Sequence, residues 1–200
     1  MIFDSANNNR SIVASRAAEI IMEEGVTDYL FAKKKAAKSL GLLTNDNLPS
    51  NHEIDNALKE YRNIFQEQVD SETIVKIKKE ALNIMTLFKD FNPHLTGQLL
   101  EGLIPKFPKI QINLFTDNLK EVEYILLNKN IAFDIKDKLY QDKLSKKKST
   151  KKIPAFILEG LWFPIELKVY FENDIRSKKN NLLSNKGMDI KKIKEFDLAT

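Results

Sequence analysis

Apolar residues recur at helical spacing through the first 90 residues of the chain. They lie three and four positions apart, as one buried face of an α-helix requires. The pattern predicts four helices, over residues 11–24, 28–40, 51–65 and 71–89. The ten residues before the first helix include three consecutive asparagines, so we expect them to fray.

Local signals predict where these helices begin and end. Gly25 and Gly41 stand where the first two periodic runs stop, as C-terminal glycines do. Thr27 is the expected cap of the second helix. Ser50 and Glu53 have the spacing of a capping box, in which each side chain accepts from the other residue's backbone N–H.

After Pro93 the apolar period changes from helical to alternating. Ile110, Ile112 and Leu114 alternate with polar residues, which predicts a strand with these three side chains on one face. Further strands are expected at 131–135, 153–159 and 165–171, with helices at 117–127, where Asp117 is the expected cap, and 188–196. This order predicts an α+β fold, with a helical region at 1–90 packed on a mixed sheet at 91–176 that has flanking helices, and a basic tail at 177–200.

The composition excludes several kinds of chemistry. The 200 residues contain no cysteine and two histidines, which excludes disulfides, thiolate metal sites and multi-histidine metal sites. No apolar run reaches the roughly 20 residues of a membrane span, and the N-terminus lacks a signal-peptide core. We therefore expect a cytoplasmic protein without a membrane partner.

Positive charge is concentrated in the C-terminal part of the chain. Residues 1–128 hold 15 basic and 18 acidic residues, a net charge of −3, whereas residues 129–200 hold 17 basic and 10 acidic, a net charge of +7. This asymmetry favours a polyanionic partner such as RNA or DNA. The expected contacts lie in a polar turn: Lys146, Lys147, Lys148, Lys151 and Lys152. The alternative is that these lysines only keep a hairpin tip solvated.

Two glycines precede the alternating strand at a distinctive spacing. Gly97 and Gly102 are five residues apart, and the strand begins about seven residues after the second. This segment resembles the signature of the nucleotidyltransferase superfamily, especially its minimal bacterial members. In that signature a Gly-Ser turn and a second glycine lead to an Asp-x-Asp strand. The superposition places Gln98 at the serine, and Lys109 and Gln111 at the two aspartates.

The resemblance implies both a fold and a chemistry. In the superfamily the two aspartates and a third carboxylate, here Glu166, hold divalent ions that bridge the triphosphate. Lys109 and Gln111 cannot supply those ligands, so no metal and no cofactor is expected. The resemblance then implies a catalytically degenerate nucleotidyltransferase-like protein that binds a nucleotide, a nucleic acid or a protein partner. Its implied phosphate- or nucleotide-binding residues are Gly97, Gln98, Gly102, Lys109 and Gln111.

A second resemblance covers more of the chain. The runs Ala17–Leu42, Leu48–Phe65 and Ile110–Ile131 are similar to an uncharacterised bacterial family described as nucleotidyltransferase-like. Two alternatives remain open. One is an active, magnesium-dependent transferase whose carboxylates come from Glu101, Glu166 or Asp117. The other is a protein-interaction module with no catalytic role.

Overall fold

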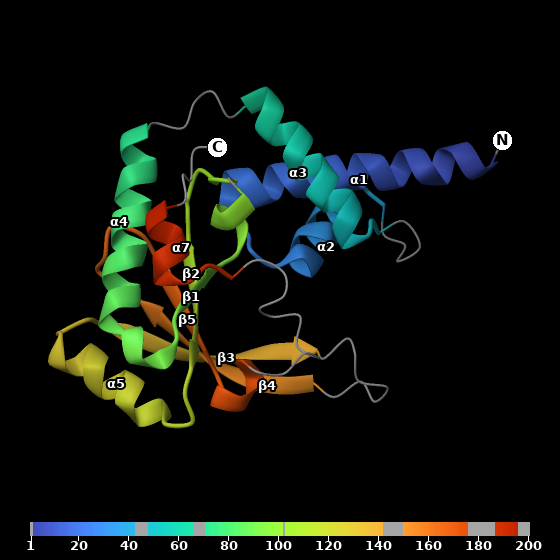
Figure 1. Cartoon of the computed structure of the whole chain (residues 1–200). Coiled ribbons are helices and arrows are strands. Elements are labelled where there is room, and N and C mark those ends of the chain that lie inside the picture. Colours follow the sequence, from blue (N-terminus) through green and yellow to red (C-terminus); the bar gives the residue numbers. More distant parts are fainter. Residues whose placement is uncertain are drawn as a thin grey trace. The chain divides into compact units, whose positions relative to one another are not determined.

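The protein is built from helices and one mixed β-sheet (Figure 1). The computed structural model describes residues 2–42, 48–65, 71–101, 103–141, 150–175 and 187–195. These residues form six α-helices and five strands, with four helices before the first strand, so the predicted α+β class is confirmed. The chain divides into two compact units, residues 1–70 with 103–108, and residues 71–102 with 109–200. The expected boundary at residue 90 thus falls inside the second unit.

The first unit is a helical core. Its helices are α1 (Ile2–Glu24), α2 (Tyr29–Ser39) and α3 (Asn51–Phe65). The packed side chains are mostly small or branched aliphatic residues, which let the helices approach closely. The fully buried ones include Val13, Ala17, Ile21, Ala32, Ala36, Ile54 and Leu58. Leu103 joins this core from the later segment of the same unit.

Two of the predicted helix starts differ from the structure. α1 begins at Ile2 rather than after residue 10. Once a helix is nucleated, each added residue gains a hydrogen bond, so weak helix formers such as asparagine are tolerated at its end. The cap of α2 is Asp28 and not Thr27, because the Asp28 carboxylate accepts from the backbone N–H groups of Leu30 and Phe31.

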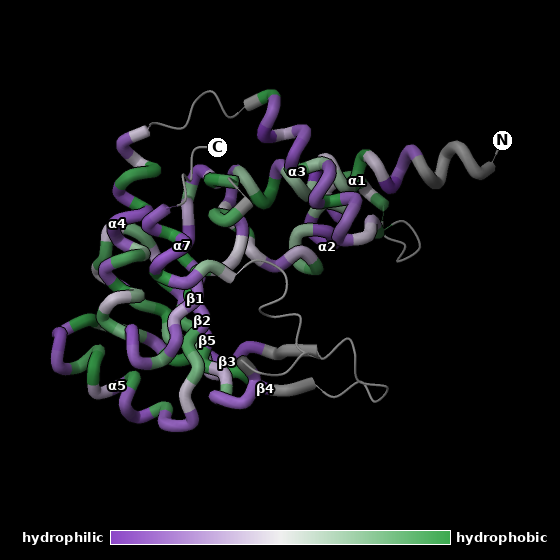
Figure 2. Tube along the Cα trace, in the orientation of Figure 1, coloured by the Kyte–Doolittle hydropathy of each residue, from purple (hydrophilic) through white to green (hydrophobic). Residues whose placement is uncertain are grey.

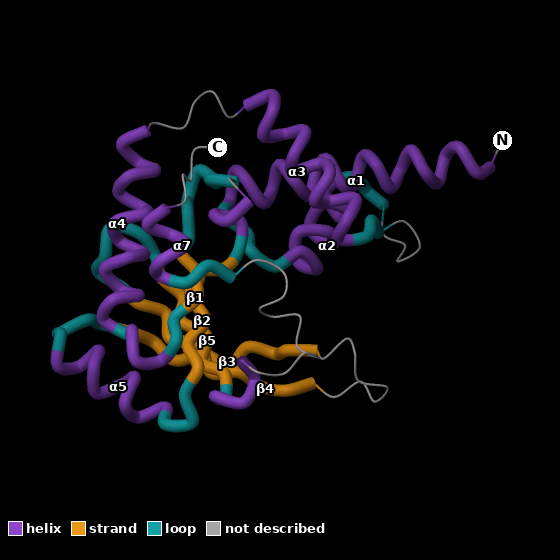
Figure 3. The backbone as a smooth tube through the Cα atoms, viewed as in Figure 1, coloured by secondary structure: helices purple, strands orange, loops and turns teal. Residues whose placement is uncertain are grey.

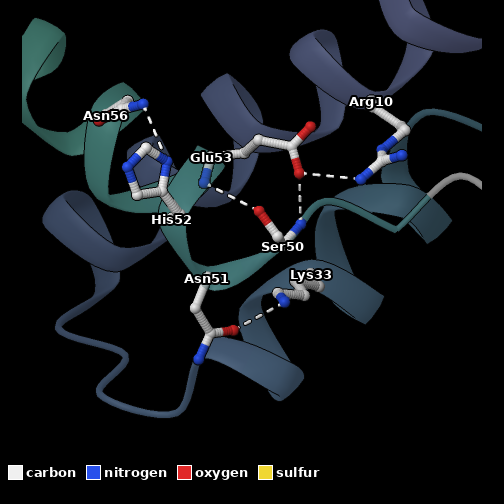
Figure 4. Close-up of polar contacts among 7 residues, drawn as sticks. All are labelled: Arg10, Lys33, Ser50, Asn51, His52, Glu53 and Asn56. Carbon is white, nitrogen blue, oxygen red and sulfur yellow. Dashed lines mark hydrogen bonds and ion pairs between the residues drawn. The ribbon is translucent and has the colours of Figure 1, made fainter.

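The capping box that begins α3 is confirmed (Figure 4). The backbone N–H of Ser50 donates to Oε2 of Glu53 at 2.6 Å, and the N–H of Glu53 donates to the Ser50 hydroxyl at 3.2 Å. The same Glu53 oxygen also accepts from Arg10 of α1 at 3.0 Å. A local helix signal therefore also ties α3 to α1.

The second unit holds the sheet (Figure 3). Its helices are α4 (Ser71–Leu87), α5 (Leu119–Asn128) and α7 (Ile190–Glu195), with 3-10 turns η3 (Lys89–Phe91), η4 (Gln98–Glu101) and η5 (Glu172–Ile175). Its strands are β1 (His94–Thr96), β2 (Ile110–Phe115), β3 (Phe133–Gln141), β4 (Thr150–Leu158) and β5 (Ile165–Tyr170). They lie in the order β1-β2-β5-β4-β3, and only the β2–β5 pair is parallel.

In this unit one strand was not predicted and two sequence expectations are corrected. β1 was not predicted, since three residues are too few to show alternation. The N-terminal cap position of α5 is Asn118, and Asp117 instead accepts from the backbone N–H of Glu172 at 3.2 Å. Lys151 and Lys152 belong to β4 and not to a turn, because the pairing of β3 with β4 extends to Thr150.

The two faces of the sheet have opposite character. One face carries the apolar residues of the central strands, such as Ile112 and Leu167, and α4 packs against β1 and β2. In Figure 1, α4 and α5 lie on the same side of the sheet. Figure 2 shows hydrophobic and hydrophilic residues alternating along both helices, as one-sided burial requires. The central strands place polar side chains on the opposite face of the sheet.

Within the part of the chain that the structure describes, no helix combines the length and the apolar character that a bilayer crossing needs.

Candidate functional site

A buried carboxylate lies at the centre of the polar sheet face. Glu166 is on β5 and is 1% exposed. Its register partner on β2 is Gln111, and the next pair on the same face is Asn113 with Lys168. Gln111 and Asn113 are also buried, at 8% and 4% exposed. The parallel pairing of β2 with β5 thus brings together side chains about 55 residues apart in sequence.

Three lysines surround this carboxylate. Nζ of Lys109 lies 3.0 Å from Oε2 of Glu166, and Nζ of Lys138, on β3, lies 3.3 Å from Oε1. Lys168 is half-buried and donates to Oε1 of Gln111 at 3.5 Å. We call Lys109, Lys138, Lys168 and Glu166 the lysine cluster. It combines three positive charges with one negative charge.

The electrostatic surroundings change the acidity of two members of the lysine cluster. Burial alone would raise the pKa of Glu166, but the ammonium groups of Lys168, Lys109 and Lys138 outweigh it and lower that pKa below 4.5. Burial lowers the pKa of Lys168 below its ordinary value. The carboxylate of Glu166 acts against this, while Lys138 and Lys109 add to it. At neutral pH Glu166 is therefore ionised and held by its neighbours.

The lowered pKa of Glu166 predicts a loss of stability in acid. A carboxyl group whose pKa is lower in the folded than in the unfolded protein stabilises the fold above the unfolded value. That contribution disappears as the pH falls from about 4.5 through the folded pKa. We expect the difference in unfolding free energy between the wild type and Glu166→Gln, measured by urea denaturation, to shrink over this range. A difference that stays constant with pH would contradict the assignment.

Gly97 lies directly beside this site. Its φ of +87° is in the left-handed region, and a Cβ there would lie 3.0 Å from Oε1 of Gln111. The absent side chain therefore leaves room for the Gln111 amide. The carbonyl of Gly97 accepts from Leu100 at 3.1 Å, which begins the turn into η4, and Gln98 is the first residue of η4.

The structure brings three of the predicted site residues together. Lys109, Gln111 and Glu166 meet on one face of the sheet with Gly97 beside them, as the superposition on the nucleotidyltransferase signature implies. Gly102 lies outside the described residues, and no family is established by this arrangement alone. The assignment of the chain to that superfamily stays a prediction.

Other predicted site residues lie elsewhere or outside the description. Asp117 follows the end of β2 that is remote from Lys109 and holds the start of η5. Lys146, Lys147 and Lys148 lie outside the described residues, as do the side chains of Glu101 and Lys151. Lys152 is exposed and pairs with Asp137 at 3.2 Å.

Lys138 and Lys168 were not expected at the site. Alternation along β5 places residue 168 on the same face as residue 166, so the sequence carried a signal for Lys168. Lys138 had no such signal. It reaches Glu166 because β3 pairs with β4 and β4 with β5, and a strand's own sequence does not specify its neighbours.

Comparison with known proteins adds no assignment: no family model, no curated protein and no solved structure matches the chain. Across the described ranges, no three His, Cys, Asp or Glu residues are grouped so that they could hold a metal ion. The lysine cluster itself contains a single carboxylate, that of Glu166.

Proposed function

We propose that the protein is a catalytically degenerate, nucleotidyltransferase-like binding protein. Its lysine cluster occupies the place where the resembling enzymes hold divalent ions. Its ligand is a nucleotide, a nucleic acid or a protein partner. It acts in the cytoplasm and without a bound metal.

One observation carries the proposal. The ammonium group of Lys109 lies 3.0 Å from Glu166, the third carboxylate in the superposition. A divalent ion at that point needs several negatively charged or neutral oxygen ligands. Here it would meet one carboxylate, the Gln111 amide and three ammonium groups. Coulomb repulsion from the lysines opposes metal binding, and without the metal the usual transfer chemistry lacks the Lewis acid that polarises the phosphoryl group.

The active-enzyme alternative needs more carboxylates than the lysine cluster supplies. Asp117 is beyond the far end of β2 and is engaged with η5. That leaves Glu166 and Glu101, and Glu166 is already paired with lysines. If the protein were only an interaction module, the buried charges of the lysine cluster would have no role, although their desolvation costs free energy.

The proposal is tested by adding magnesium or manganese to the wild-type protein. We expect calorimetric titration to show no saturable site and the melting temperature to be the same in excess magnesium and in EDTA. We also expect no incorporation of labelled nucleotide into RNA, DNA or protein acceptors. A saturable site in the micromolar range, or magnesium-dependent transfer, would contradict the proposal and favour the active enzyme.

A further inference from the structure

We propose that Lys109, Lys138 and Lys168 form a binding site for a phosphate-bearing anion and that this site needs no metal ion. The inference rests on the proposed function, because it names the class of ligand that the altered site takes. It begins from the arrangement of three ammonium groups about one buried carboxylate.

The charges on this face of the sheet do not cancel. The lysine cluster has a formal net charge of +2, and β3 adds Asp134 and Lys136, which offset each other on the same face. Like charges repel more strongly where water is partly excluded. Burial, together with Lys138 and Lys109, accordingly lowers the pKa of Lys168, although Glu166 opposes the shift. A bound dianion would neutralise this excess charge.

The ammonium groups also have hydrogen-bond donors to spare. Each carries three N–H groups. Within the described residues, Glu166 is the ion-pair partner of Lys109 and of Lys138, through one carboxylate oxygen each. Their side chains remain 23% and 45% exposed, so the unused donors are open to a ligand from solvent. Glu166 thereby holds the lysines close together without using all of their donors.

The number of donors and the excess charge favour phosphate over a carboxylate ligand. A phosphate group has three acceptor oxygens and close to two negative charges at neutral pH. It can accept from three lysines at once and match the charge of +2. A carboxylate has one charge and two oxygens, and would leave one ammonium group unmatched. Lysine binds phosphate as a point charge, so no forked arginine is required.

The same charge explains why no metal is needed. In a metal-dependent site, the ion offsets the negative charge of the phosphates. Here the lysines supply that charge themselves. Magnesium should therefore weaken binding, because it neutralises the anion before the anion reaches the protein.

The test is calorimetric titration with inorganic tripolyphosphate and, in a second arm, with ATP. Both are run in EDTA at roughly 50 mM salt, where exposed charges are weakly screened. We expect one saturable site and weaker binding in excess magnesium. If both probes bind with similar affinity, the site recognises the phosphate chain. If ATP binds more tightly, the nucleoside makes added contacts. Both results support the proposal.

Substitutions in the lysine cluster distinguish binding at this site from non-specific attraction of an anion to a basic protein. Lys138→Gln and Lys109→Gln should each weaken tripolyphosphate binding about tenfold or more, as the loss of a charge-assisted hydrogen bond does. Lys138→Arg should retain most of the affinity. The matched control is Lys120→Gln, which removes an exposed lysine from α5 and should leave the affinity unchanged.

Three results of the titrations would overturn the inference. They are the absence of saturable binding by either probe, binding that requires magnesium, and an equal loss of affinity in Lys120→Gln and Lys138→Gln. Binding of single-stranded RNA without either small anion would also overturn it, in favour of the basic C-terminal region. If tripolyphosphate fails to bind and magnesium alone does not change the melting temperature, this inference fails and the proposed function stands. A magnesium site on the protein alone would remove the proposed function as well.

Discussion

Replacing Glu166 by glutamine is expected to lower the free energy of unfolding by about 1.5–3 kcal/mol at neutral pH, because charge-assisted hydrogen bonds to a buried carboxylate are lost while Lys109 and Lys138 keep contact with solvent. The glutamine has nearly the same shape, so packing is retained and the change is electrostatic. It leaves Lys109, Lys138 and Lys168 close together without their counter-charge. Urea denaturation of the wild type and the variant measures the difference.

A surface ion pair provides the matched control for Glu166→Gln. Asp137 and Lys152 are 3.2 Å apart, and their side chains are more than half exposed. Asp137→Asn should therefore change the free energy of unfolding by at most about 1 kcal/mol.

A second check combines Glu166→Gln with Lys109→Met. Removing the stranded ammonium should recover part of the loss, with a coupling of about 1–3 kcal/mol. Additive effects would show that Lys109 and Glu166 do not interact.

Changing both Lys109 and Gln111 to aspartate should make the stability of the protein depend on divalent ions. The two positions share a face of the sheet with Glu166, so the variant groups three carboxylates where the resembling enzymes bind metal. Without metal, their mutual repulsion should lower the melting temperature. With magnesium at about 100 times its dissociation constant, the folded state should gain about 2.7 kcal/mol. Thermal melts in EDTA and in magnesium or manganese measure this gain.

The control for the double aspartate variant is Lys109→Asn with Gln111→Asn. It has the same size of side chains but lacks the added negative charges, so its melting temperature should not respond to metal. If the aspartate variant is folded by circular dichroism and still shows no response, positions 109, 111 and 166 do not form a common site. That result would also remove the structural basis for the resemblance.

Local sequence specifies those features of the fold that depend on neighbouring residues. The capping box of Ser50 and Glu53 specifies the start of α3, because both hydrogen bonds lie within one helical turn. Gly25 ends α1 in the left-handed region, at a φ of +66°. The alternation from Ile110 to Leu114 predicts β2 and its two faces, since side chains of a strand alternate between faces.

The sequence does not decide which of two adjacent residues caps a helix when both are good caps. Thr27 and Asp28 are both good helix caps, and Asp117 and Asn118 offer the same ambiguity before α5. In α2 the Asp28 carboxylate reaches two backbone N–H groups. Before α5, Asp117 is engaged by Glu172, from a segment that follows β5. That contact is remote in sequence, so the pattern around residue 117 contains no sign of it.

The residues of the lysine cluster are brought together by tertiary contacts and not by any local pattern. The period of a strand specifies which of its own side chains share a face, but not which strand lies beside it. Glu166 meets Lys109 and Gln111 through the parallel pairing of β2 with β5, and Lys138 reaches it from β3. The sequence supplied the lysines and the buried carboxylate. Long-range strand pairing placed the ammonium groups of Lys109 and Lys138 at 3.0 and 3.3 Å from the carboxylate of Glu166, and it did so because the apolar faces of the same strands had to be buried together.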